Sequence, residues 1–154
     1  MATVEQSIEV NVPVRVAYDQ WTQFEDLPRF MEGVESVTQL DDTHLRWVAE
    51  VGGQREEWTA EIVQQIPDDR IEWRSTSGVR QTGIVTFEPV GDQQTRVDVQ
   101  FEYEPEGVVE SLGSKLGQDE RRVKGDLERF KEFVESRGAP TGAWRGTVQS
   151  GEPR

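Results

Sequence analysis

The fold is decided by the stretch from residue 41 to residue 105, which reads DDTHLRWVAEVGGQREEWTAEIVQQIPDDRIEWRSTSGVRQTGIVTFEPVGDQQTRVDVQFEYEP. Apolar and polar residues alternate along it, and Gly-Gly, Pro-Asp-Asp and Pro-Val-Gly-Asp segments interrupt the alternation. A period of two residues indicates a strand with one buried face, and such interruptions mark turns. The stretch therefore predicts five successive strands joined by short turns, which is an antiparallel meander.

Shorter elements are predicted before this meander. Residues 3–12 and residues 34–40 have the alternation of strands. Between them, apolar residues recur with helical spacing over residues 14–21, directly after a proline that can open a helix. Asp26 is expected to cap a second short helix that runs to Met31.

A long amphipathic helix is predicted from Gly107 to Arg137, because its apolar residues fall on one stripe. It is the only later element large enough to cover a one-sided sheet. One helix about 10–12 Å wide cannot fill the concave side of a curved sheet of six to seven strands. The order predicts an α+β fold with a cavity between sheet and helix, and such a cavity is by default a ligand site.

The chain is expected to form one domain, residues 1–137, followed by a flexible C-terminal tail, residues 138–154. A chain of 154 residues can bury the core of a single domain. The last seventeen residues lack periodicity and are rich in glycine, proline and polar residues. Trp144, with Arg145, is the one anchor in this tail that could dock on the domain or on a neighbouring subunit.

Composition excludes several classes of site and partner. The chain has no cysteine, which excludes disulfides, thiolate metal sites and cysteine nucleophiles. Its single histidine, His44, lies in a predicted turn, and no carboxylate cluster with metal-ligand spacing accompanies it. No phosphate-binding loop or dinucleotide fingerprint appears. We therefore expect neither a metal nor a cofactor.

The charge and the N-terminus bear on partners and location. Thirty acidic against seventeen basic residues give a net charge of −13, which repels nucleic-acid backbones and anionic membrane surfaces. The N-terminus lacks the basic and apolar regions of a signal peptide. No segment approaches the roughly eighteen apolar residues of a membrane span. We expect a cytoplasmic protein with no nucleic-acid partner and no membrane insertion; the sequence does not give the oligomeric state.

Three tryptophans, Trp47, Trp58 and Trp73, occupy inward positions of three consecutive predicted strands. Together they could form an aromatic wall that stacks a planar ligand, with each indole N–H as a polar handle. The alternative is that they are ordinary core residues. Burying three indoles without a ligand, however, requires partners for three N–H groups. We therefore expect at least one of them to line the cavity.

Further candidates share these inward positions. Ser75, Gln81 and Tyr103 are polar residues among apolar neighbours, and their polar groups must find a ligand, water or each other as partner. Leu112 and Leu116 lie on the apolar stripe of the long helix, where they would face the cavity.

Glu56 and Glu120 are the candidate acid–base pair. Glu56 shares the inward parity of Trp58, and Glu120 is spaced on the long helix to face the sheet. If both faced the cavity, desolvation could raise the pKa of one of them into the range useful for proton transfer. The alternative is that one or both reach solvent or an arginine such as Arg55 or Arg74.

The element order β-α-α-β₆-α and several local segments closely resemble the bacterial polyketide cyclase/dehydrase group of the START-like (SRPBCC) superfamily. The segments are WTQFEDLPRFM, GGQREEWTAEI, DRIEWRSTSG, GIVTFEP, TRVDVQFEYEPEG and DLERFKEFVE. The resemblance covers residues 3–137 and implies the helix-grip fold, with a deep cavity between the sheet and the C-terminal helix. It further implies that Phe30 and Met31 form the lip of that cavity.

Three classes of function are compatible with this resemblance, because the same fold carries transport, sensing and catalysis. The first is binding of a hydrophobic, aromatic or polyketide-like small molecule in the cavity. The second is a polyketide aromatase/cyclase or dehydratase that acts by orientation and proton transfer. The third is a protein-interaction or stress-associated module without a ligand.

Overall fold

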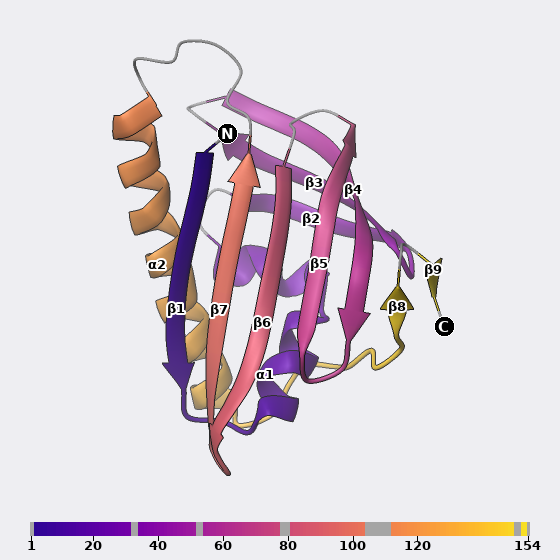
Figure 1. Ribbon diagram of the computed structural model, residues 1–154, viewed down its shortest axis with the longest axis vertical. Helices are drawn as coiled ribbons and strands as arrows, with labels where there is room; N and C mark the ends of the chain where they lie inside the picture. Colours follow the sequence, from indigo (N-terminus) through magenta and orange to yellow (C-terminus); the bar gives the residue numbers. More distant parts are fainter. Residues whose placement is uncertain are drawn as a thin grey trace.

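The computed structural model describes residues 2–31, 34–51, 54–77, 81–103, 112–149 and 152–153. It confirms the α+β helix-grip fold: a long antiparallel sheet bends around two short helices and a long C-terminal helix (Figure 1). In chain order, the elements are β1 (Ala2–Val10), α1 (Val14–Trp21), η1 (Phe24–Arg29), β2 (Val34–Asp41), β3 (His44–Val51), β4 (Gln54–Ile66), β5 (Arg70–Ser77), β6 (Gln81–Gly91), β7 (Gln94–Tyr103), α2 (Leu112–Arg137), β8 (Val148–Gln149) and β9 (Glu152–Pro153).

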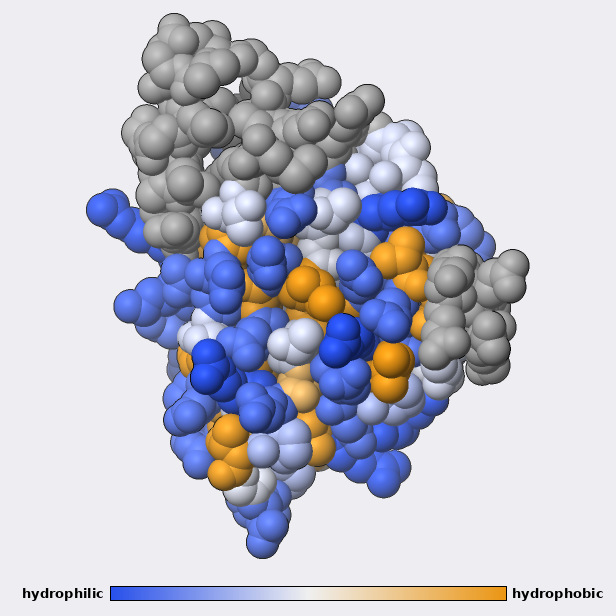
Figure 2. All heavy atoms as spheres, viewed as in Figure 1, coloured by the Kyte–Doolittle hydropathy of each residue, from blue (hydrophilic) through white to orange (hydrophobic). Residues whose placement is uncertain are grey.

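The sheet order is β1-β7-β6-β5-β4-β3-β2, with every pairing antiparallel. Strands β2 to β7 follow one another as the predicted meander, and β1 closes the other edge by pairing with β7. The face of the molecule shown in Figure 2 is mostly hydrophilic, with apolar residues scattered over it. The buried apolar side chains of the strands face the helices instead, as expected for a one-sided antiparallel sheet.

The concave side of the sheet is shared by three helices rather than covered by one. Helix α2 lies against β1, and its buried stripe consists of Val123, Leu127, Phe130 and Val134. Helices α1 and η1 lie over the rest of the concave face (Figure 1) and bury Tyr18, Trp21, Phe24 and Leu27 there. The sequence predicts that the long helix alone covers the sheet, whereas in the structure α1 and η1 cover part of its concave face (Figure 1). Within the described residues, no helix has the length and apolar character to cross a membrane.

The second short helix begins earlier than the sequence predicts. Asp26 was expected at its N-cap, but η1 begins at Phe24 with Gln23 as the N-cap residue, and Asp26 lies inside it. The reason is its 3₁₀ geometry, in which the backbone N–H of Asp26 already donates to the carbonyl of Gln23 at 2.9 Å. The Asp26 carboxylate is therefore free to bind elsewhere.

The C-terminal segment, residues 138–149, packs against the domain, and docking through Trp144 and Arg145 is one of the arrangements that the sequence left open. Strand β4 pairs with β3 only as far as Glu61, which leaves the edge at Gln64 and Gln65 open. Strand β8 pairs with this edge, and Val148 is fully buried. Composition alone suggested flexibility, but the open edge of β4 supplies backbone hydrogen-bonding groups for the segment.

Candidate functional site

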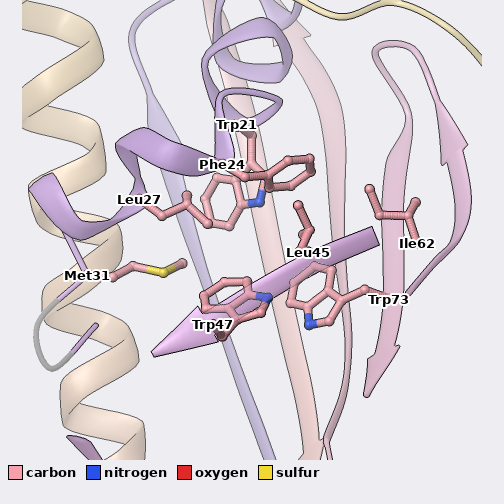
Figure 3. Close-up of a pocket in the computed structure, with 8 residues that line it drawn as sticks. All are labelled: Trp21, Phe24, Leu27, Met31, Leu45, Trp47, Ile62 and Trp73. Carbon is pink, nitrogen blue, oxygen red and sulfur yellow. The ribbon is translucent and has the colours of Figure 1, made fainter. Parts of the chain in front are cut away.

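An apolar pocket lies on the concave side of the sheet, where the short helices meet strands β3, β4 and β5. We call it the aromatic pocket. Figure 3 shows the side chains of α1 and η1 on one side of it and those of Trp47 and Trp73 on the other. Its lining consists of Trp21, Phe24, Leu27, Met31, Leu45, Trp47, Ile62 and Trp73.

Strand register brings two of the predicted tryptophans together. Trp47 on β3 and Trp58 on β4 lie directly opposite each other, and their rings are nearly parallel, at 3°, with centroids 6.0 Å apart. Such cross-strand pairs on one face of a sheet stabilise it. Trp47 lines the pocket, whereas Trp58 supports it from the next strand and is not among the lining residues.

The third tryptophan is placed by a glycine. Trp73 on β5 pairs with Gly83 on β6, and its indole lies across that glycine. Phe101 on β7 holds the same indole in an edge-to-face contact, with centroids 5.7 Å apart and planes at 63°. The absence of a side chain at position 83 therefore lets Trp73 lie flat against the sheet and face the pocket.

All three indole N–H groups are buried without a hydrogen-bond partner among the described residues. Trp47, Trp58 and Trp73 are only 7%, 6% and 4% exposed. A buried donor without an acceptor costs about 1–3 kcal/mol, so native proteins rarely leave one, and three on neighbouring strands are unusual. Because Trp47 and Trp73 line the aromatic pocket, two of these donors belong to its otherwise apolar wall.

The described side chains leave little free space in the aromatic pocket. Its cavity volume is about 10 Å³, which is room for about one water molecule, whereas typical ligand pockets have roughly 300–1,000 Å³. The sequence predicts a cavity of the size of a typical ligand pocket. The difference arises because Phe24, Leu27 and Met31, which belong to η1 and the residues after it, point into the space that the sequence left to a single helix.

The other predicted site residues divide into three groups. Met31 is among the residues that line the pocket. Phe30 lies instead in the core, in ring contact with Trp21 and Phe130 at 6.3 and 5.2 Å between centroids, and it does not line the pocket. The side chains of Tyr103, Leu112 and Leu116 lie outside the described part of the structure, so their roles stay predictions.

Two predicted polar residues meet each other rather than the pocket. The backbone N–H of Gln81 donates to the hydroxyl of Ser75 at 2.9 Å across the ends of β6 and β5. Both residues are half-buried, and neither is among the residues that line the aromatic pocket. The Ser75 hydroxyl therefore has one partner of its own, which is one of the alternatives that the sequence left open.

The candidate acid–base pair is described only in part. Glu56 is half-buried on β4, opposite Ala49, whereas the side chain of Glu120 lies outside the described residues. His44 binds the carboxylate of Asp41 within its turn at 2.9 Å, and no cluster of metal-binding side chains occurs in the described ranges. The proton-transfer pair stays a prediction.

Sequence reasoning missed the pocket wall formed by Trp21, Phe24 and Leu27. Trp21 belongs to the apolar stripe of the first short helix, and that spacing indicates burial but not a pocket. Phe24 and Leu27 precede and follow the misplaced helix start at Asp26. An earlier start for η1 would have put both on its inner face.

Comparison with known proteins places this architecture among characterised folds. Residues 10–132 match the family model described as polyketide cyclase / dehydrase and lipid transport. An uncharacterised 17.2 kDa protein from the melC2-rnhH intergenic region of Streptomyces lincolnensis is 52% identical over 149 residues, which cover 96% of this chain and 99% of that protein.

Solved structures show the same fold at lower identity. A START superfamily protein from Mycobacterium smegmatis has a TM-score of 0.74 at 16% identity, covering 87% of this chain and 99% of that one. The Zhui aromatase/cyclase from Streptomyces sp. R1128 also has a TM-score of 0.74 at 16% identity, covering 92% of this chain and 98% of that one. At this identity, the two likenesses establish the fold alone.

Proposed function

Because the chain belongs to the polyketide cyclase/dehydrase and lipid transport family, we propose that it binds a hydrophobic, aromatic or polyketide-like small molecule in the aromatic pocket. The proposal rests on the buried indole N–H groups of Trp47 and Trp73, which line the pocket and have no acceptor among the described residues; Trp58, stacked on Trp47, has a third such group. An apolar wall with unmatched donors suits a ligand that is mostly ring or chain but carries oxygen acceptors.

The chemistry of the wall narrows the class of ligand. Trp47, Trp73 and Phe24 offer flat aromatic surfaces to a planar ring system. Carbonyl or phenolic oxygens on that ring would accept hydrogen bonds from the indoles, each adding about 0.5–1.5 kcal/mol to affinity. A purely hydrocarbon ligand would fill the pocket but leave the donors unmatched. We therefore favour oxygenated aromatic or polyketone ligands over simple hydrocarbon chains.

Binding must enlarge the pocket, since its present volume of about 10 Å³ cannot hold a ring system. Leu27 and Met31 belong to the short helical segment rather than to the hydrogen-bonded sheet, so they are the lining residues that can move with least disruption. Methionine has three rotatable side-chain bonds and repacks readily. A ligand would take the place of these side chains, and the tryptophans on the strands would stay fixed.

Native mass spectrometry of the protein purified without denaturation tests the proposal. We expect a fraction of the protein to carry a small molecule that is released on unfolding and that contains aromatic rings with carbonyl or hydroxyl groups. Protein found only at the mass of the bare chain, together with no binding of a planar aromatic ketone added in solution, would overturn it.

A further inference from the structure

The C-terminal segment, residues 139–149, crosses the end of α1 and the start of η1 before it reaches β4. Its first contact is a reciprocal one with Gln20 on α1. The backbone N–H of Thr141 donates to the Gln20 side-chain oxygen at 2.9 Å, and the Gln20 amide donates to the Thr141 hydroxyl at 3.2 Å. The Thr141 hydroxyl also donates to the carboxylate of Asp26, inside η1. One threonine thus ties both short helices together.

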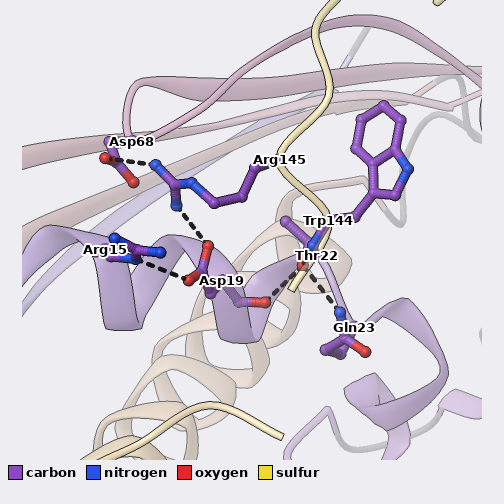
Figure 4. Close-up of polar contacts among 7 residues, drawn as sticks. All are labelled: Arg15, Asp19, Thr22, Gln23, Asp68, Trp144 and Arg145. Atoms are coloured by element: carbon purple, nitrogen blue, oxygen red, sulfur yellow. Dashed lines mark hydrogen bonds and ion pairs between the residues drawn. The ribbon is translucent and has the colours of Figure 1, made fainter. Parts of the chain in front are cut away.

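The next contacts grip the junction between the two helices (Figure 4). The backbone N–H of Trp144 donates to the hydroxyl of Thr22 at 3.1 Å, and this hydroxyl in turn donates to the carbonyl of Asp19. Gly142 approaches Gln23 so closely that a Cβ atom there would come within 2.6 Å of the Gln23 side-chain oxygen. The segment therefore contacts both residues that separate α1 from η1.

Arg145 connects the same region to the sheet. Its guanidinium donates to Asp19 on α1 and, at 2.7 Å, to Asp68 in the turn between β4 and β5 (Figure 4). It also lies over the ring of Tyr18, 5.5 Å from the centroid. The Asp19 side chain is only 6% exposed, and a buried carboxylate is stable only when it is paired. Arg145 is therefore the closer of two arginines that pair with Asp19; Arg15 on α1 lies 3.7 Å from the same carboxylate (Figure 4).

Strand β8 anchors the far end of the segment. Val148 is fully buried and pairs with Gln65 on β4. Gln65 lies three positions after Ile62, which lines the aromatic pocket. Three elements that the segment contacts carry pocket-lining residues: Trp21 on α1, Phe24 and Leu27 on η1, and Ile62 on β4.

We propose that residues 139–149 act as a clamp that holds the α1–η1 wall of the aromatic pocket in place, with Thr141 and Arg145 as positioning residues. An effect of the clamp on ligand entry rests on the proposed function. Its role in positioning α1 and η1 does not. The clamp lies beyond residue 132, where the family match ends. Releasing it would let Phe24 and Leu27 move away from the strand tryptophans.

Amide hydrogen exchange in the full-length chain tests the hold on the wall. In Arg145→Met and Thr141→Val, we expect the amides of Asp26, Phe30 and Met31 to exchange about tenfold faster, which corresponds to the loss of about one charge-assisted hydrogen bond. Arg145→Lys should restore part of the protection, because it keeps the charge but cannot fork between two carboxylates.

A matched substitution controls for general loss of stability. Arg96→Met removes an exposed ion pair with Asp98 on β7 and should leave exchange in η1 unchanged. Faster exchange confined to residues 139–149 would overturn the clamp, because the segment would then dock without holding the wall. Equal acceleration in β6 and η1 would overturn it too, since the segment would then stabilise the whole domain and position nothing in particular.

A second measurement separates the clamp from the proposed function. Stopped-flow quenching of tryptophan fluorescence by 2-(hydroxymethyl)anthraquinone should show association several-fold faster in Arg145→Met than in the unmodified chain. Unchanged association, in a variant whose η1 amides exchange faster, would overturn the role of the clamp in ligand entry. If the probe binds neither protein while exchange in η1 still accelerates, the clamp stands and the proposed ligand class fails.

Discussion

The indole of Trp73 lies across Gly83 on the neighbouring strand, so closely that a Cβ atom at position 83 would come within 2.4 Å of the indole Cζ2. Real Cβ atoms do not approach other atoms to this distance. The indole also lines the aromatic pocket, and it makes an edge-to-face contact with Phe101. Because a glycine and two strands determine where this tryptophan lies, Trp73 is a fixed part of the pocket wall.

Gly83→Ala should therefore displace the Trp73 indole and lower the free energy of unfolding by about 1–3 kcal/mol, the usual cost of overpacking a core. Urea unfolding, together with the near-ultraviolet circular dichroism of the tryptophans, measures both effects. Gly91→Ala is the matched control, because its Cβ atom would meet Gln94 at an ordinary 3.6 Å. Equal stability of the two variants would show that Trp73 is not held against position 83.

Trp47→Phe keeps an aromatic ring in the pocket but removes one N–H donor. We expect it to weaken binding of 2-(hydroxymethyl)anthraquinone by about two- to tenfold, the value of one hydrogen bond. Fluorescence titration measures the dissociation constant, and Trp144→Phe, which lies outside the pocket and keeps the backbone hydrogen bond to Thr22, should leave it unchanged. A similar loss in both variants would argue that Trp47 only fills the core.

A chain that ends after Gly138 should unfold at a lower temperature than the full chain. It loses the burial of Val148 and leaves Asp19 without Arg145. We expect a loss of at least about 2 kcal/mol, which corresponds to roughly 4–8 °C in Tm for a domain of this size. A chain ending at Gln149 keeps these contacts and is the control. If the chain that ends after Gly138 had an unchanged Tm, the C-terminal segment would be the flexible tail that composition predicts.

Stability should fall in alkaline solution because of Tyr18. Burial, with the carboxylates of Asp68 and Asp19, raises the pKa of Tyr18 from 10.0 to about 12, against the smaller opposing effects of Gln65 and Arg145. The folded state thus favours the neutral phenol. The Tyr18 pKa shift contributes fully to the free energy of unfolding below pH 10, where the phenol keeps its proton in the unfolded chain as well. This contribution is lost between about pH 10 and 12.

Urea unfolding across this pH range measures the loss, and Tyr18→Phe is the control because it cannot ionise. We expect the free energy of unfolding to fall more steeply in the unmodified chain than in Tyr18→Phe. Identical slopes for the two proteins would mean that Tyr18 is not held in its neutral form by the fold.

Much of the fold could be predicted from the sequence, because alternation and turn residues act locally. The segments around Trp47, Trp58 and Trp73 show a period of two residues, and the structure places these residues on one buried face of consecutive strands. The end of α2 was equally predictable, since Gly138 takes the left-handed conformation, at φ 68°, that ends helices.

The site was less predictable, because its shape depends on contacts between distant segments. Whether Phe24 and Leu27 fill the concave side depends on where η1 begins, and that start follows from backbone geometry rather than from a capping residue. The C-terminal segment is the clearest case. Its composition indicates flexibility, yet Arg145 finds Asp19, which lies 126 residues earlier in the chain. No local pattern records such a pairing.

The central claim is that the strand tryptophans offer hydrogen-bond donors to an aromatic ligand. Fluorescence titration with two probes of the same ring size, 2-(hydroxymethyl)anthraquinone and 2-(hydroxymethyl)anthracene, tests it most directly, since only the first carries ring carbonyls. We predict that both quench tryptophan emission and that the anthraquinone binds more tightly by about two- to tenfold per satisfied N–H. Equal affinities, or no binding of either probe, would contradict the claim.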